Sequence, residues 1–386
     1  MIGLGEDGPS GLSAASREAL DAADVVFGGP RHLALVDVGA RGQAWPVPFA
    51  VDPVLALRGR AVVVLASGDP FWFGAGGSVV PYLMPDEWRA YPAPSTFSLA
   101  ANALGWRLEE VHCLGLHAAP FSRLRAVLGR GTHAICLLRD AAAVGDLVTW
   151  LCDHGHGASD LWVMEALGGP RARIRKAKAD AMTLADIITP VAVAIHAAGP
   201  GLPRASGLPD DLFAHDGQIT KRPVRALTMS ALAPRAGEVL WDIGAGSGSV
   251  GIEWLLAGGA QVHAVEADAA RGARAVANAE SFGLAHRLTL HLHRAPDGLA
   301  DLPLPDAVFV GGGASEVLLS CLWQILPVGT RVVCNAVTLE TEALMALWAG
   351  RVGGDLLRIA LSEAVPLGTK RSWRAALPIV QWSVAR

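Results

Sequence analysis

Cysteine and charge are both scarce in this 386-residue sequence. Its five cysteines are scattered and include no CxxC pair: Cys113, Cys136, Cys152, Cys321 and Cys334. An odd, dispersed set argues against a disulfide framework or a cysteine zinc site, and it favours a reducing cytoplasm. Charged residues make up 18% of the chain against 52% hydrophobic, which argues against disorder and allows large buried cores.

Long hydrophobic runs are also missing. No run approaches the roughly 20 apolar residues that a membrane span requires, and those at 61–66 and 191–198 have the length of a strand. The first residues, MIGLGEDG, lack the basic and apolar parts of a secretory signal. We therefore expect a soluble cytoplasmic protein without membrane association, and the length favours at least two domains.

The net charge of −4 provides no general attraction for nucleic acid, but basic residues cluster locally. The clusters are Arg171, Arg173, Arg175, Lys176 and Lys178; Lys221, Arg222 and Arg225; and Lys370, Arg371 and Arg374. Any one of them could be an ordinary solvated face. Together they favour a small polyanionic substrate, because discrete carboxylates need discrete basic partners.

The Gly-, Pro- and Asp-rich segment 199–218 is the best candidate for a domain boundary. After it, short β-rich runs at 238–243, 261–266, 288–293, 306–310 and 331–336 alternate with helical stretches at about 248–258, 268–282, 314–326 and 338–349. Such alternation predicts an α/β fold with a parallel sheet covered on both faces. Runs at 356–361 and 378–383 should add an antiparallel pair. Seven strands in this layout are typical of class I methyltransferases.

The N-terminal half alternates less regularly. Strands are expected at 24–27, 61–66, 111–116, 133–138, 161–165 and 191–196, and a break near residue 110 predicts two α/β lobes. The expected organisation is therefore a bilobal domain over 1–200, a linker over 201–218 and a methyltransferase domain over 219–386.

A glycine-rich loop carries the strongest chemical signal. Asp242, Gly244, Ala245, Gly246, Ser247 and Gly248 end one strand and open a helix, and Glu266 ends the next strand. Glycines let the backbone turn sharply beside a ligand, while Glu266 suits ribose hydroxyls. Because Asp242 suits a cationic amino acid rather than a pyrophosphate, the loop favours S-adenosylmethionine. A dinucleotide site, from the G-x-G-x-x-G pattern that starts at Gly246, and a glycine turn without ligand are the alternatives.

Two later positions are further candidates for the same site. Ala295 follows the strand at 288–293, where an adenine would lie, and Asn335 ends the strand at 331–336. Asn335 is either a ligand contact or the N-cap of the following helix. His291 and His293 share one face of a strand, but no third ligand is in view, so we expect no metal site.

Four N-terminal segments carry a family resemblance. GLGEDG, SGDPFWFG, PAPSTFSLAANALGW and EALGGPRARI occur in the order seen in tetrapyrrole (precorrin) methylases. The segment from PDDLFAHDGQITKRPVRA through the glycine loop resembles the precorrin C15-methylating, decarboxylating domain fused to such methylases. Together these resemblances cover essentially the whole chain and are similar to bifunctional C5,15-methylating enzymes of cobalamin biosynthesis.

The resemblance implies two S-adenosylmethionine sites, one per domain, and methylation of reduced precorrin-6 at C5 and C15 to precorrin-8, with decarboxylation of a ring acetate. It places Gly5, Asp69, Thr96 and Leu167 near the cofactor of the first domain, and Thr220, the glycine loop, Glu266 and Ala295 near that of the second. It also suggests a homo-oligomer.

The first domain departs from the family pattern at 114–119 and at Ala172. The alternative is therefore a class I small-molecule methyltransferase whose N-terminal module binds a tetrapyrrole without turnover.

Methyl transfer from a sulfonium requires positioning more than acid–base help, so we expect no catalytic triad. Basic residues would instead clamp the carboxylates of the substrate: Lys221, Arg222, Lys370, Arg371 and Arg374. This polycarboxylate tetrapyrrole would be the main binding partner, and no nucleic acid is expected.

Overall fold

The computed structural model describes all residues of the chain and divides them into two units. Unit 1 comprises Met1–Phe121 and Val127–Gly201, and unit 2 comprises Ser122–Ala126 and Leu202–Arg386. The segment 202–218, suggested by the sequence as part of a linker, belongs to unit 2, where Leu208 and Phe213 are buried in the core. None of the helices has the length and hydropathy needed to cross a bilayer.

The first lobe of unit 1 is built on a four-stranded parallel sheet. Its strands are β1 (Ile2–Leu4), β2 (Val25–Gly28), β3 (Gly42–Ala44) and β4 (Val62–Ser67), in the order β1-β4-β2-β3. The accompanying helices are α1 (Ala14–Asp21), α2 (Pro30–Val36), α3 (Asp52–Leu55) and α4 (Gly76–Val79). The central strands β2 and β4 are almost continuously apolar and buried, as parallel strands covered on both faces must be.

The second lobe contains a five-stranded sheet of the order β5-β6-β9-β7-β8. Its elements are α5 (Thr96–Leu104), β5 (Val111–Gly115), β6 (His133–Leu137), α6 (Ala142–Asp153), β7 (Asp160–Glu165), β8 (Arg173–Lys178) and β9 (Val191–His196). The chain leaves the first sheet before α5 and enters the second at β5. Unit 1 thus holds two separate sheets joined through α5, and the break near residue 110 stays a prediction.

Unit 2 contains the expected seven-stranded sheet, in the order β12-β11-β10-β13-β14-β18-β15. Its strands are β10 (Val239–Ile243), β11 (Gln261–Glu266), β12 (Leu288–Leu292), β13 (Ala307–Val310), β14 (Arg331–Ala336), β15 (Asp355–Ile359) and β18 (Ile379–Ala385). The first five are parallel, and β18 runs antiparallel to both β14 and β15. The predicted antiparallel pair is thus confirmed.

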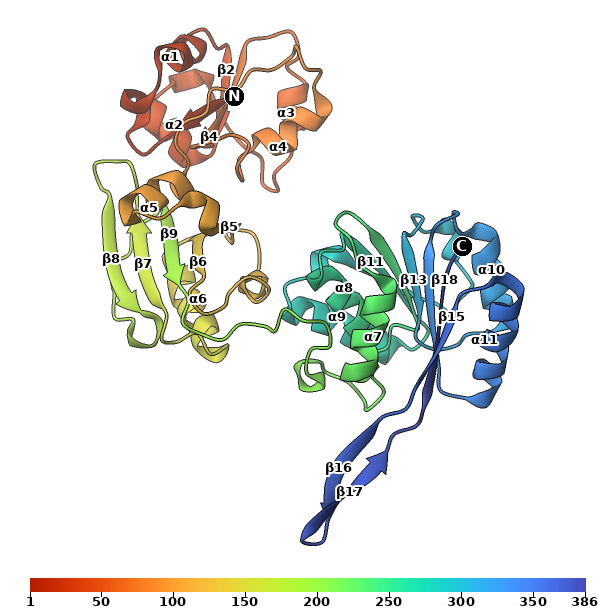
Figure 1. The fold of residues 1–386 in the computed structure, drawn as a ribbon. Coiled ribbons are helices and arrows are strands. Elements are labelled where there is room, and N and C mark those ends of the chain that lie inside the picture. The colour runs from red at the N-terminus through yellow and green to blue at the C-terminus, as the bar shows by residue number, and fades with distance from the viewer. The chain divides into compact units, whose positions relative to one another are not determined.

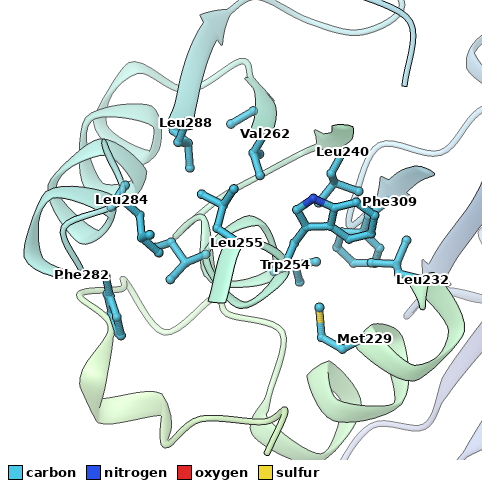
Figure 2. Packing of buried hydrophobic residues seen from close by; sticks show 14 of the residues in the cluster. Met229, Leu232, Leu240, Trp254, Leu255, Val262, Phe282, Leu284, Leu288 and Phe309 are labelled. Atoms are coloured by element: carbon cyan, nitrogen blue, oxygen red, sulfur yellow. The ribbon is translucent and has the colours of Figure 1, made fainter. Parts of the chain in front are cut away.

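Five helices cover the two faces of this sheet. They are α7 (Arg222–Leu232), α8 (Ser249–Leu256), α9 (Ala269–Ser281), α10 (Glu316–Ile325) and α11 (Leu339–Val352). Residues of α7, α8 and α9 pack on one face, in the cluster around Trp254 and Phe282 that Figure 2 shows. Residues of α10 and α11 pack on the other face around Trp241 and Trp382. Both faces are therefore dry, and the carboxyl ends of the parallel strands remain available for a site.

A separate two-stranded hairpin interrupts the chain between β15 and β18. Its strands β16 (Ser362–Leu367) and β17 (Lys370–Ala375) pair only with each other, and Figure 1 shows them as an arm that extends from the sheet. Nearly every residue of the arm is exposed, including Trp373 and Leu367. The sequence analysis did not anticipate this arm, because neither strand has a buried apolar face to produce an alternating pattern.

Candidate active sites

The glycine loop of unit 2 lies where β10 ends and α8 begins. Gly244, Gly246 and Gly248 all have positive φ angles, of 71°, 57° and 71°. A Cβ at Gly248 would lie 3.0 Å from the Cβ of Ala275, so this glycine lets the loop pack on α9. At Gly246, by contrast, a Cβ would find nothing closer than 3.9 Å. The loop is therefore closely packed where it meets α9 and leaves open space beside Gly246.

Glu266 holds this loop in place from the end of β11. Its Oε2 accepts a hydrogen bond from the backbone N–H of Gly246 at 2.9 Å, and its Oε1 accepts from Ala267 and Asp268, also at 2.9 Å. The buried carboxylate thus joins two adjacent loops at the carboxyl edge of the sheet. Each carboxylate oxygen can accept more than one hydrogen bond, so Glu266 retains acceptor capacity for a ligand hydroxyl.

Asp242 lies on β10 next to the loop, and only one of its two carboxyl oxygens has a hydrogen-bond partner. Its Oδ2 accepts from the N–H of Gly251 at 3.0 Å, whereas its Oδ1 is buried without a partner. Burial raises the pKa of Asp242 to about 7, the charge of Glu266 adds to the rise, and the bond from Gly251 opposes it. An unpartnered carboxyl oxygen in this position is suited to a cationic group of a ligand.

Two buried polar side chains lie behind the loop: Asn278, which the sequence analysis missed, and Arg225, which it placed in a basic cluster for a substrate although the side chain is fully buried. Asn278, on α9, donates to the carbonyl of Ser247 at 2.8 Å and exchanges two hydrogen bonds with the backbone of Ala214. Arg225, fully buried on α7, pairs with Glu253 at 2.6 Å and donates to the carbonyl of Thr220. A polar residue on the buried face of a predicted helix is the signal that could have identified Asn278.

The remaining predicted cofactor residues occupy different environments. Thr220 lies two residues before the start of α7 and is half-buried. Ala295 follows β12 and packs against the apolar cluster around Trp241. Asn335 donates to Thr228 at 3.0 Å and accepts from Gln381 at 3.0 Å in a buried network. The N-cap alternative for Asn335 is wrong, because α11 begins later and its cap is the side chain of Thr338.

The basic residues predicted as clamps are all exposed, at two separate places. Lys221 and Arg222 lie at the start of α7 and make no ion pair, so both charges are available to a ligand. The other three, Lys370, Arg371 and Arg374, lie on β17 and are called the hairpin bases below. Strand geometry puts Lys370 and Arg374 on one face of the arm and Arg371 on the other, so the hairpin bases do not share a surface.

Unit 1 contains a cavity of about 360 Å³ whose lining comes from both lobes. Gly5, Thr96 and Leu167 all line it, whereas Asp69 does not and instead accepts a hydrogen bond from the N–H of Phe71. Ser95 caps the helix that begins at Thr96. Three of the four cofactor residues expected in this half therefore meet at one cavity.

Glu6 links the two lobes beside this cavity. Its buried carboxylate forms an ion pair with Arg31 of the first lobe and lies 3.5 Å from Arg171 of the second. The backbones also approach closely, because a Cβ at Gly169 would lie 2.5 Å from the Cβ of Glu6 and 2.8 Å from its carbonyl oxygen. Only glycine fits at residue 169.

Most of the basic cluster at 171–178 is occupied within the protein. Strand β8 pairs antiparallel with β7, which places Arg173 opposite Glu165. Arg173 and Arg175 both bind the buried carboxylate of Glu165, at 2.5 and 2.9 Å, and the two lysines pair with Asp160. These ion pairs favour a structural role for the four residues on β8, so their charges are largely balanced within unit 1. The structure contains no group of three potential metal ligands.

Two family descriptions divide the chain between them. Residues 1–183 match "Tetrapyrrole (Corrin/Porphyrin) Methylases", and residues 211–386 match "Precorrin methyltransferase domain". A precorrin-6Y C(5,15)-methyltransferase (decarboxylating) of Sinorhizobium sp. is 44% identical over 99% of this chain and 95% of its own length. The chain belongs to the precorrin-6Y C(5,15)-methyltransferase family.

Other members of the family also match the full length. The enzyme of that name from Mycobacterium tuberculosis is 38% identical over 100% of this chain and 99% of its own. A solved structure, the C-terminal domain of precorrin-6Y C5,15-methyltransferase from Rhodobacter capsulatus, is 52% identical and covers 48% of this chain and all of its own, with a TM-score of 0.47. As a member of this family, the chain is a C-methyltransferase that uses S-adenosylmethionine as methyl donor.

Proposed function

We propose that this chain methylates precorrin-6Y, a reduced precorrin-6, at C5 and C15 and decarboxylates a ring acetate, as a step of cobalamin biosynthesis. The two methylations would use two cofactor sites, one in residues 1–200 and one in residues 219–386. The observation that carries the proposal is the full-length similarity to enzymes named for this double reaction. The two sites described above, one in each half, support it.

The residues of the glycine loop fit S-adenosylmethionine. The space beside Gly246 admits a ligand close to the backbone, and Glu266 has acceptor capacity for ribose hydroxyls. The unpartnered Oδ1 of Asp242 suits the ammonium of the methionine part. Ala295 would border the adenine, with Thr220 and Asn335 at the margin. The bound cofactor supplies an electrophilic methyl group.

In unit 1 the cavity supplies the corresponding position. Gly5, Thr96 and Leu167 line it and are proposed to hold the second cofactor, with Asp69 acting through the turn that it stabilises. The largely apolar lining would limit the access of water to the reacting carbon. Contacts with the walls would hold that carbon in line with the methyl group. No residue of either site needs to act as a nucleophile.

Basic residues are proposed to fix the macrocycle through its carboxylates. Lys221 and Arg222 are free of ion pairs at the start of α7, adjacent to Thr220. Holding one acetate while the ring accepts its electrons is what decarboxylation requires, and a protein contributes to it by orientation. The hairpin bases would contribute further cations from the arm.

We also propose that the chain acts in the cytoplasm as a homo-oligomer. An isolated two-stranded hairpin is marginally stable in water, and this arm exposes Trp373 and Leu367, which are 74% and 66% accessible. A second copy that covers these side chains would stabilise the arm. Sedimentation velocity of the full chain and of Trp373→Ser tests this, since a monomeric wild-type protein would contradict it.

Mass spectrometry of precorrin-6Y incubated with the full chain and S-adenosylmethionine tests the proposed reaction. We expect a product that has gained two methyl groups and lost one carbon dioxide. A product with a single methyl group would show that only one half is active, in line with a non-catalytic N-terminal module. An unchanged substrate would refute the proposal.

A further inference from the structure

The cavity of unit 1 has an unbalanced positive charge. Among the side chains that line it, Arg31 is the only arginine or lysine and Glu6 is the only acid. The negative charge of Glu6 is not available to Arg31 alone, because the second carboxylate oxygen of Glu6 lies 3.5 Å from the guanidinium of Arg171. Two guanidinium groups therefore share one carboxylate, and one positive charge remains at the cavity wall.

The remaining neighbours of Arg31 do not supply the missing negative charge. Its Nη2 donates to Ser67 Oγ at 2.6 Å and to His32 Nε2 at 2.8 Å. Because a guanidinium only donates, Nε2 of His32 must accept, and the ring is neutral. Burial and the charge of Arg31 lower the pKa of His32 to about 4, which agrees with a neutral ring.

Arg31 is nevertheless held firmly and remains accessible. Its Nη1 forms the bond to Glu6 and its Nη2 forms two more, so two of its five N–H groups make no hydrogen bond within the protein. The side chain is 35% exposed. A cation fixed by three partners loses little further freedom when it binds an anion, which favours affinity.

The rest of the lining suits a flat apolar ligand. Trp45, Trp72, Phe73 and Phe97 all contribute to the cavity, and Trp72 and Phe73 both pack on Phe97. Aromatic walls with a single fixed guanidinium match an apolar ring that carries a carboxylate. The aromatic side chains would cover the apolar ring of the ligand, and the guanidinium of Arg31 would bind its carboxylate.

We infer that Arg31 is the carboxylate-binding residue of the N-terminal cavity and that Glu6 is the positioning residue which orients it. The inference rests on the proposed function, because it assigns a specificity determinant to the proposed C5-methylating half. The carboxylate belongs either to the tetrapyrrole or to the amino acid end of S-adenosylmethionine. Both present the same group to Arg31.

The test uses the full chain with Arg31→Gln, Arg31→Lys and a matched control, Arg107→Gln. Arg107 is exposed in the same unit, pairs with Glu109 and Glu110, and does not line the cavity. For each protein we would measure KM and kcat for precorrin-6Y in formation of the C5-methylated product, and the dissociation constants of S-adenosylmethionine by calorimetry.

For a tetrapyrrole carboxylate, Arg31→Gln should raise KM for precorrin-6Y roughly tenfold to a hundredfold and leave cofactor binding unchanged. For a cofactor carboxylate, one of the two dissociation constants should rise by that factor instead. Arg31→Lys keeps the positive charge but lacks the planar guanidinium that donates two parallel N–H groups, so it should recover part of the affinity that Arg31→Gln loses. The C15 product provides an internal check that each variant is folded.

The inference would be overturned if Arg31→Gln matched the Arg107→Gln control in both measurements, or if it lowered kcat alone. A separate probe distinguishes this failure from failure of the proposed function. If the wild-type chain methylates nothing, binding of uroporphyrin, a polycarboxylate ring, still reports on Arg31 through fluorescence quenching. Tighter binding by wild type than by Arg31→Gln would then support the inference, and equal binding would refute it.

Discussion

Replacing Asp242 by asparagine tests how the C-terminal cofactor site uses its buried carboxyl. In the free protein burial raises the pKa of Asp242 to about 7, so the neutral acid dominates below that pH. An ammonium group placed at Oδ1 would select the carboxylate. Binding therefore has to release a proton, and the affinity of wild type should fall as the pH is lowered below 7.

The size of this effect follows from the degree of ionisation. A carboxyl group with a pKa of about 7 is half ionised at pH 7 and about 1% ionised at pH 5. If only the carboxylate binds, the C-terminal site should bind S-adenosylmethionine about fiftyfold more weakly at pH 5 than at pH 7. Asp242→Asn should bind weakly at both values and show no such dependence.

Stability should respond with the opposite sign. The usual aspartate pKa of 3.8 applies when the chain is unfolded, so ionising Asp242 in the free native state costs stability as the pH rises from about 4 to 7. A pKa that differs by about three pH units between the folded and unfolded states corresponds to about 4 kcal/mol. This destabilisation is fully present above pH 7. Asp242→Asn removes this cost, so its stability relative to wild type should increase across that range.

Calorimetry at pH 5, 6 and 7 measures the affinities, and urea unfolding without cofactor at pH 4 and 8 measures the stabilities. Asp301→Asn, an exposed acid of the same unit, is the control for loss of a carboxylate. If the asparagine variant kept the fiftyfold change in affinity, the assignment of Asp242 to the ammonium would be refuted. If its relative stability did not depend on pH, the raised pKa of Asp242 in the free protein would be refuted instead.

Three further outcomes are expected. Asn278→Ala should lower the free energy of unfolding of unit 2 by about 3 kcal/mol in urea, through the loss of the three hydrogen bonds of this buried side chain, and a loss within 0.5 kcal/mol of zero would contradict this. Arg225→Met should cost roughly 3–5 kcal/mol because it leaves Glu253 buried without its partner, and adding Glu253→Gln should restore part of it in the same assay. Alanine at all three hairpin bases should raise the KM for precorrin-6Y without changing cofactor affinity, so unchanged kinetics would exclude them as clamps.

The sequence was sufficient for features that depend on local pattern. The order of strands and helices in unit 2 follows from apolar runs separated by polar helices, and the glycine loop follows from the steric needs of a turn at a strand end. Asp242 and Glu266 could be located in the same way, since both stand at the ends of strands that flank this loop. Their positions need no knowledge of distant contacts.

What the sequence could not provide depends on register and on partners far along the chain. Arg173 and Arg175 look free until β8 is aligned with β7, which brings Glu165 between them. Arg225 likewise finds Glu253 on another helix. Opposite charges that are separated in sequence meet only through tertiary packing, so a basic run cannot be assigned to a ligand from composition alone.

The contact between Glu6 and Gly169 has a consequence for how this enzyme could change its preference. The main chain at Gly169 lies there against the Cβ and the carbonyl group of Glu6, with no space for even a methyl group. Exchanging other wall residues therefore leaves the spacing of the walls unaltered. A substrate with new ring substituents would therefore have to be accommodated by exchanging side chains that line the cavity. The distance between the lobes at Gly169 would stay the same.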